Sequence, residues 1–479
     1  MIPKRRRFRV LLVIVAVLLV GLGVRITIFL TKDEPQNYAN VIQQFKYGSV
    51  GTEQDQGIPY FIWSVLPDVF SDLLPAGAGT GYERFGFIYE DQADEQHPRP
   101  IGATYREKPV PLIGLNCASC HVGTVRASPS TPAKIVLGMP ATGLKLSTYI
   151  GFLRAVGRDP RFNADELIPA IRKRFKLSYI NAQFYRHAVI PKTKSGLQKV
   201  DRDFKWLDYY PAAGPGRVST FSSWKVKFDL DPKSDNFLGV VDFPSVWNQQ
   251  IRKDMSLHWD GNNASLLERN ISASLASGAT ADSLDLNQLD RVTTWLQALP
   301  APKFPPNRID RDLAGKGASS YEQHCASCHD IGGPRIGKVT PLNEIGTDPT
   351  RADSFDSELV THMNSLGNGK PWAFSHFRNT DGYANAPLDG LWLRAPYLHN
   401  GSVPNLRALL FPAERPVVFY TGYDVYDWKS VGFVSSGAAR KDGFRYDTRL
   451  QGNSNAGHLF GTTLPTPDRL AILEYLKTK

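Results

Sequence analysis

The sequence has 479 residues, which is enough for two or three domains with separate hydrophobic cores. Its hydrophobic fraction of 42% and charged fraction of 21% are ordinary for a globular protein. The net charge of +10 is concentrated in the first thirty residues, which hold six basic residues and no acid, so the remainder gives no reason to expect nucleic-acid binding.

The N-terminus joins a basic cluster to an apolar segment. No polar side chain interrupts residues 10–24, and the apolar character resumes after Arg25 and ends at Leu30. About 20 apolar residues span a bilayer, and no A-x-A-like cleavage site follows. We therefore expect residues 1–30 to be a basic cytoplasmic tip and a single-pass inner-membrane anchor in the lipid bilayer, with a cleaved signal peptide as the alternative. The basic cluster would then leave residues 31–479 in the periplasm.

All four cysteines of the chain lie in two copies of the pentapeptide CASCH. The first copy holds Cys117, Cys120 and His121, and the second holds Cys325, Cys328 and His329. Cys-x-x-Cys-His is the attachment signature of c-type haem, because two thiols add to the two vinyl groups of one haem and the histidine ligates the iron. A disulfide or a four-cysteine zinc site would not require the histidines. We predict two covalently bound haem c groups held by the four cysteines, with His121 and His329 as iron ligands.

Two amphipathic helices are predicted to close the two haem domains. In residues 286–299 one stripe is apolar, and Pro300 ends the helix. The second helix begins near Thr466, as cap, with Pro467 in the first helical position, and it runs to the lysine-rich C-terminus. Another helix is expected to lead into the second pentapeptide.

These elements predict a mainly α fold, with two cytochrome c-like helical haem domains, long loops and one preceding transmembrane helix. Residues 300–308 are rich in proline and are predicted to be a linker. The N-terminal haem domain would then occupy residues 31–300, with an insertion at 155–240, and the C-terminal haem domain residues 309–479.

A second repeat suggests where the sixth iron ligands come from. Trp247 and Trp392 each precede a Leu-His pair and a glycine-containing turn. We expect His399 to be the distal ligand of the second haem, with a loop histidine bonded to backbone as the alternative, and His258 to be the corresponding candidate at the first haem. Trp259 is a candidate electron relay, or a packed aromatic side chain. The methionines at 139 and 363 are predicted to fill the core, and no iron-ligand role is expected for His97, His187, His324, His362, His376 and His458.

Residues 242–262 (DFPSVWNQQIRKDMSLHWDGN) and 394–410 (RAPYLHNGSVPNLRALL) resemble the dihaem superfamily of bacterial cytochrome c peroxidases and rubber-cleaving oxygenases. The tail from residue 414 is more similar to the rubber-oxygenase branch. The resemblance implies an open N-terminal haem at His121 and a second haem held by His329 and His399. The peroxidases carry a distal glutamate after the WDG segment, where Glu268 is the available acid. Oxygenases carry an apolar aromatic residue there, and Leu275 takes its place.

The expected function is that of an oxidoreductase. O2 or peroxide would be activated at the N-terminal haem, with the C-terminal haem as electron-transfer centre and Trp259 and Glu268 as catalytic candidates. The alternative is a pure electron-transfer cytochrome in which His258 completes the coordination of the first iron. Expected partners are a periplasmic or membrane electron donor and O2 or H2O2, and no nucleic acid.

Overall fold

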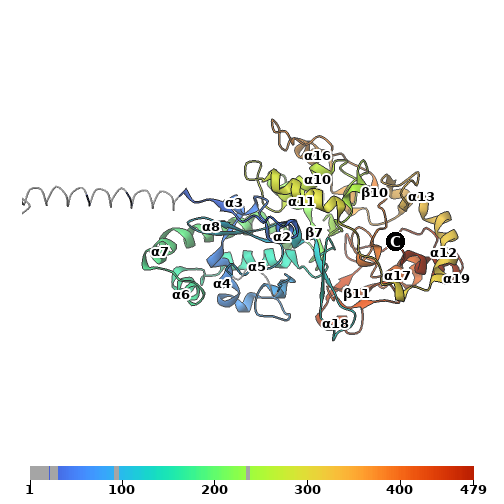
Figure 1. The fold of residues 1–479 in the computed structure, drawn as a ribbon, viewed down its shortest axis with the longest axis horizontal. Coiled ribbons are helices and arrows are strands. Elements are labelled where there is room, and N and C mark those ends of the chain that lie inside the picture. Colours follow the sequence, from blue (N-terminus) through green and yellow to red (C-terminus); the bar gives the residue numbers. More distant parts are fainter. Residues whose placement is uncertain (1–13, 15–20, 22–30, 91–95, 234–237) are drawn as a thin grey trace, which may run out of the picture.

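The computed structural model describes Ile14, Gly21 and residues 31–90, 96–233 and 238–479. Figure 1 shows α6 and α7 at one end of the molecule, α12, α13 and α19 at the other, and α10 and α11 between them. The helices before residue 300 are α2 (Val41–Tyr47), α3 (Thr52–Gln56), α4 (Tyr60–Val69), α5 (Leu146–Arg158), α6 (Ala164–Arg174), α7 (Tyr179–Phe184), α8 (Ile190–Asp203), α9 (Thr220–Lys227), α10 (Leu266–Ala276) and α11 (Leu286–Ala298). The later ones are α12 (Arg311–His324), α13 (Ala326–His329), α14 (Leu342–Ile345), α15 (Thr350–Asp353), α16 (Ser357–Asn364), α17 (Leu406–Leu410), α18 (Ala439–Asp442) and α19 (Thr466–Leu476).

Short antiparallel strands connect these helices. One sheet has four strands in the order β1-β3-β4-β2 and is formed by β1 (Glu34–Pro35), β3 (Ala103–Glu107), β4 (Leu112–Leu115) and β2 (Ile58–Pro59). The other sheets are two-stranded and pair β5 (Val122–Val125) with β6 (Lys134–Leu137), β7 (Arg217–Ser219) with β8 (Val240–Asp242), β9 (Val339–Pro341) with β10 (Gly382–Ala384), β11 (Val418–Thr421) with β14 (Phe444–Asp447), and β12 (Tyr426–Asp427) with β13 (Gly432–Phe433).

The prediction of a mainly helical fold is therefore wrong. The first pentapeptide follows strand β4, and the second follows helix α12, as expected for that copy. Strands of two to five residues are too short for a clear two-residue periodicity, and their partners lie elsewhere in the chain. The sequence pattern therefore did not reveal them.

The predicted membrane anchor also requires correction. Within residues 31–90, 96–233 and 238–479, and at the two isolated described positions, no helix is both long and apolar enough to cross a bilayer. Of the predicted anchor at residues 1–30, only Ile14 and Gly21 belong to the described residues. The described residues therefore do not support the predicted transmembrane helix or the single-pass inner-membrane location, and most of the segment predicted to form the anchor lies outside them.

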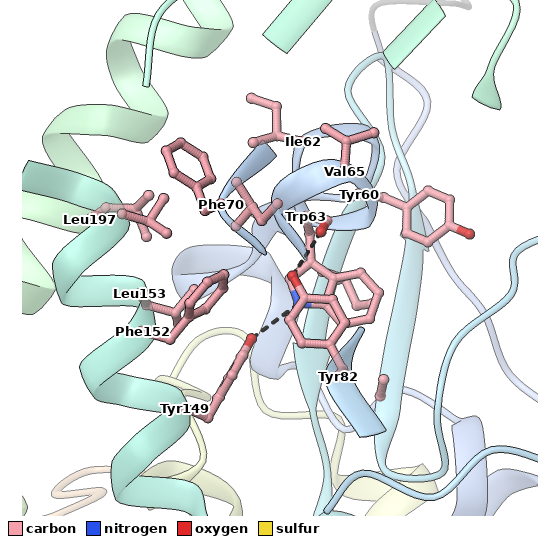
Figure 2. Packing of buried hydrophobic residues seen from close by; sticks show 14 of the residues in the cluster. Tyr60, Ile62, Trp63, Val65, Phe70, Tyr82, Tyr149, Phe152, Leu153 and Leu197 are labelled. Carbon is pink, nitrogen blue, oxygen red and sulfur yellow. Dashed lines mark hydrogen bonds between the residues drawn. The ribbon is translucent and has the colours of Figure 1, made fainter. Parts of the chain in front are cut away.

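An aromatic core lies between α4, α5 and the segment that follows α4 (Figure 2). The rings of Trp63 and Tyr82 stack with centroids 4.1 Å apart and planes 10° apart. Trp63 Nε1 donates to the hydroxyl of Tyr149 at 3.0 Å, and the Tyr82 hydroxyl donates to the carbonyl of Trp63 at 2.7 Å. The polar groups of these three aromatic side chains each have a hydrogen-bond partner, which offsets the cost of burying them. This core supports one wall of the cavity described below.

The two predicted closing helices are present. Helix α11 buries Leu289, Val292 and Leu296, which confirms the predicted apolar stripe. Helix α19 begins at Thr466, but its cap position is Pro465, which makes no side-chain hydrogen bond, so the predicted threonine cap is wrong.

Helices α12 and α19 approach closely where α12 has a glycine. A Cβ atom on Gly317 would lie 2.0 Å from the carbonyl oxygen of Ala471 in α19. The absence of a side chain at this position therefore lets the two backbones approach, and the crossing holds the second pentapeptide at the end of α12.

Candidate functional site

The first pentapeptide forms a tight turn immediately after β4. Asn116 stabilises this turn, because its side chain accepts from the amide of Ala118 at 3.0 Å and donates to the carbonyl of Gly48 at 3.0 Å. The turn places Cys117, Cys120 and His121 on the wall of one cavity. The cysteines are free thiols.

The ring of His121 is held with one nitrogen available. Its Nδ1 donates to the carbonyl oxygen of Pro244 at 2.8 Å, so Nε2 carries the lone pair. Burial lowers the pKa of His121 to about 4, and the imidazole is neutral near pH 7. A neutral, oriented imidazole is the form that ligates a metal.

The cavity beside this turn has a volume of about 850 Å³ and is called the large cavity below. Most of its exposed wall is apolar, with side chains from α5, α9, α10 and α16. The apolar and aromatic residues of its wall include Leu153, Phe221, Trp224, Phe243, Leu275, Phe355, Met363 and Phe377. The volume is in the range of cavities that hold cofactors and ligands.

His258 and Trp259 line this same cavity. His258 has a backbone φ of 64°, in the left-handed region, and its Nδ1 lies 2.5 Å from Oδ1 of Asn262. Burial lowers the pKa of His258 to about 4, so this imidazole is also neutral near pH 7. The structure thus brings the two histidines predicted for the first haem to one cavity.

Glu268 is placed differently from its expected role. It is absent from the residues that line the large cavity, whereas its neighbour Arg269 is present. Its carboxylate accepts hydrogen bonds from Asn263 Nδ2 at 2.9 Å, the amide of Ser375 at 2.9 Å and Nδ1 of His376 at 2.6 Å. Burial alone would raise the pKa of Glu268, but these bonds hold it below its usual value. The glutamate therefore anchors the loop at residues 375–376.

The second pentapeptide presents His329 in a similar way. Its Nδ1 donates to the carbonyl oxygen of Ala386 at 2.9 Å, which leaves Nε2 available. The ring of His458 lies opposite, with ring centroids 6.2 Å apart. Two imidazoles that ligate one metal from opposite sides, each with a metal–nitrogen bond of about 2 Å, would have centroids roughly 6 Å apart. The spacing of the two rings would therefore allow His329 and His458 to hold one metal between them.

His458 is a site residue that the sequence patterns missed. Its Nδ1 is buried and has no hydrogen-bond partner among the described residues, and burial, aided by nearby His329, lowers its pKa to about 4. Its backbone φ is 49°, a left-handed conformation that is uncommon for histidine. Its position after a glycine in the tail that resembles the oxygenase branch was the available signal.

His399 occupies another position. Its ring stacks on that of Tyr383, with centroids 3.9 Å apart and planes 13° apart, and 4% of the residue is exposed. Burial lowers the pKa of His399 well below its usual value, and Arg351 and Arg217 act in the same direction. Among the described ring contacts, His458 and not His399 faces His329.

A bonded route leads from the first pentapeptide to Trp259. His121 is bonded to Pro244, as described, and Pro244 lies two residues after Asp242 in the chain. The carbonyl oxygen of Asp242 accepts a hydrogen bond from Nε1 of Trp259 at 2.8 Å.

The route continues from Trp259 to the second pentapeptide. The carbonyl oxygen of Trp259 accepts from the amide of Ala384 at 2.9 Å, and two residues later Ala386 accepts from His329. Trp259 therefore lies on a path of covalent and hydrogen bonds that joins the two histidines.

These residues fit a covalently attached haem at each pentapeptide. Each pentapeptide offers two free thiols and a neutral imidazole. The ring of His458, whose Nδ1 has no hydrogen-bond partner among the described residues, lies opposite His329. Among the described residues, no group of three or more His, Cys, Asp or Glu is arranged to hold a metal ion.

Comparison with known proteins agrees with this chemistry. Residues 382–420 match the family described as RoxA-like, cytochrome c-like. The match supports a similarity to the rubber-oxygenase-like cytochromes c. It implies covalently bound haem c and a role in oxidoreduction or electron transfer.

Two relatives come from Sinorhizobium fredii (strain NBRC 101917 / NGR234). Uncharacterized protein y4iM is 31% identical over 281 residues, which are 52% of this chain and 63% of the relative. Uncharacterized protein y4iJ is 28% identical over 514 aligned residues, which are 83% of this chain and 84% of the relative. The chain thus spans less than two thirds of the first relative's length, and neither name states an activity.

Proposed function

We propose that this protein is a dihaem cytochrome c of the rubber-oxygenase-like branch that reduces O2 or peroxide in the large cavity. One haem would be held by Cys117, Cys120 and His121, and the other by Cys325, Cys328 and His329. Bound haem supplies one-electron iron redox chemistry, tuned by axial ligands and burial.

The protein's own residues would divide the work between the two sites. His329 and His458 face one another and would give the second iron two histidine ligands, which suits an electron-storing centre. This assignment replaces the predicted His399. The large cavity beside His121 has a mostly apolar wall, which would suit the first haem and a small oxidant.

The observation that carries the proposal is the bonded route through Trp259. Electron transfer between two centres requires that they be close and connected. His121 and His329 each donate a hydrogen bond to a carbonyl group at one end of this route, that of Pro244 and that of Ala386. An electron supplied to the second centre would reach the first through residues that the fold already holds in place.

Carbon monoxide binding to the reduced protein tests this proposal. We expect two haems by mass spectrometry, one of which binds carbon monoxide and shifts its Soret band. In the variant His458→Ala both should bind it, and in His399→Ala only one. A wild-type protein in which neither reduced haem responds would refute the proposed reaction.

A second candidate function is pure electron transfer with both irons six-coordinate. It is favoured by His258, because this neutral imidazole lines the same cavity as His121 and is oriented by Asn262. If this candidate holds, carbon monoxide leaves the wild type unchanged, and His258→Ala converts one haem to a form that binds it.

A further inference from the structure

A second and much smaller cavity lies beside the large one. Its volume is about 10 Å³, and it is called the small cavity below. Asp242, Phe243 and Arg394 line both cavities, and Thr421 of β11 lines the small one. The remaining residues of its wall are Pro140, Thr142, Pro215, Gly216, Ala395 and Pro396.

Three residues of this wall carry buried polar atoms without a hydrogen-bond partner among the described residues. They are Oδ2 of Asp242, Nε of Arg394 and Oγ1 of Thr421. Buried polar groups are normally paired with protein or with ordered water. One water molecule needs a cavity of roughly 10–15 Å³ and two to four polar partners, and the small cavity offers both.

Burial disfavours the charged form of the Asp242 carboxyl group. Burial raises the pKa of Asp242 well above its usual value, and the nearby charge of Arg217 only partly opposes this. The other titratable groups around Asp242 are Arg394, Tyr446 and His399, whose carbonyl accepts from the amide of Asp242. The neutral form of this carboxyl group is therefore favoured in the wall shared by the two cavities.

We propose that the small cavity binds one water molecule and that Asp242, bonded to this water, donates protons to the large cavity. This inference rests on the proposed function, because reduction of O2 or peroxide consumes protons. Asp242 would then fill the role that the sequence suggested for Glu268, whose carboxylate is engaged elsewhere.

The proposed proton transfer begins at Oδ2 of Asp242. The O–H bond at Oδ2 of Asp242 breaks, and the proton bonds to an oxygen atom of O2 or peroxide. That oxygen atom is reduced by electrons from the electron donor. The bound water then returns a proton to Oδ2 and is itself reprotonated from solvent. Arg394 and Arg217 favour the transient carboxylate because both are cationic.

Infrared spectroscopy of the haem-loaded protein tests the water and the protonated acid without a reaction. The wild type at neutral pH should show the C=O stretching band of a protonated carboxyl group, and Asp242→Asn should lack it. Thr421→Val has nearly the same shape but no hydroxyl, so it should shift the band, whereas Thr421→Ser should leave the band in place. An unchanged band in Asp242→Asn or in Thr421→Val would overturn the site.

Reoxidation of the reduced protein by O2 or peroxide tests the proton transfer. General acid catalysis typically contributes about 100-fold or more, so Asp242→Asn should react at least about 100-fold more slowly. A variant as fast as the wild type would overturn the donor role while the proposed function stands. A wild type that fails to react would refute the proposed function and the donor role together, while the infrared result still decides the water site.

Discussion

The bonded route between the two histidines predicts the effect of Trp259→Phe. The change keeps an aromatic ring but removes Nε1, so the carbonyl of Asp242 loses the hydrogen bond it accepts at 2.8 Å. A buried acceptor left without a partner costs about 1–3 kcal/mol, and we expect the free energy of unfolding to fall by that amount. The route through residue 259 that connects the two pentapeptides then lacks one of its hydrogen bonds. We therefore expect electrons to redistribute more slowly between the two proposed haems.

Trp247→Phe is the matched control. Trp247 is fully buried and its Nε1 donates to the carbonyl of Asp389 at 3.1 Å, but this bond is not part of the route. Both variants should therefore be destabilised in chemical denaturation, while only Trp259→Phe should slow the electron redistribution that follows pulsed reduction of the oxidised protein. Equal redistribution rates in the two variants would refute the assignment of the route.

Three further predictions concern other parts of the structure. If the proposed second haem is held as described, His458→Ala should strongly change its reduction potential, because the iron would lose a histidine ligand. His399→Ala should change the reduction potentials only slightly, because it would disturb packing and not ligation. Gly317→Ala should lower the free energy of unfolding by at least about 1–3 kcal/mol, because its Cβ would meet the backbone of Ala471. Gly315→Ala, on the open face of α12, should raise the free energy of unfolding by about 0.5–1 kcal/mol. If thermal denaturation gave the reverse order of stability, the close crossing of α12 and α19 would be contradicted. The pKa of Glu268 is lowered in the folded protein, so its charged carboxylate stabilises the fold above the unfolded pKa, and this stability is lost as the pH falls through the folded pKa. Glu268→Gln should therefore weaken the dependence of the free energy of unfolding on pH in the acid range. An unchanged pH dependence in this variant would exclude the stabilising effect of the Glu268 carboxylate.

Local sequence was sufficient where the chemistry is contained in a few adjacent residues. The spacing of two thiols and one imidazole in each pentapeptide predicts a haem attachment, and the cytochrome c-like match supports covalent haem c. The helix at 286–298 was predictable for a similar reason, because its apolar stripe recurs within one segment. The short strands were not, since each depends on a partner from another part of the chain.

The choice among histidines could not be made locally. His399 has the more suggestive sequence context, yet the fold stacks it on Tyr383 and brings His458 to His329. His329 and His458 are separated by more than a hundred residues, and their distance depends on how the tail folds back.

The same holds for the acid of the large cavity. Glu268 follows the expected motif, but α10 directs Arg269 to the cavity and leaves the glutamate bonded to the loop at 375–376. Asp242 had no motif of its own as an acid, and only the meeting of β8 with Arg394 and Thr421 gives its carboxyl group a buried site.

The sequence by itself predicted where haem would be attached and which histidine would ligate each iron, because that chemistry needs only five consecutive residues. Only the tertiary structure decided which groups lie close to these histidines and which hydrogen bonds connect the two pentapeptides. Those groups come from distant segments, and packing of the whole chain sets the distances between them.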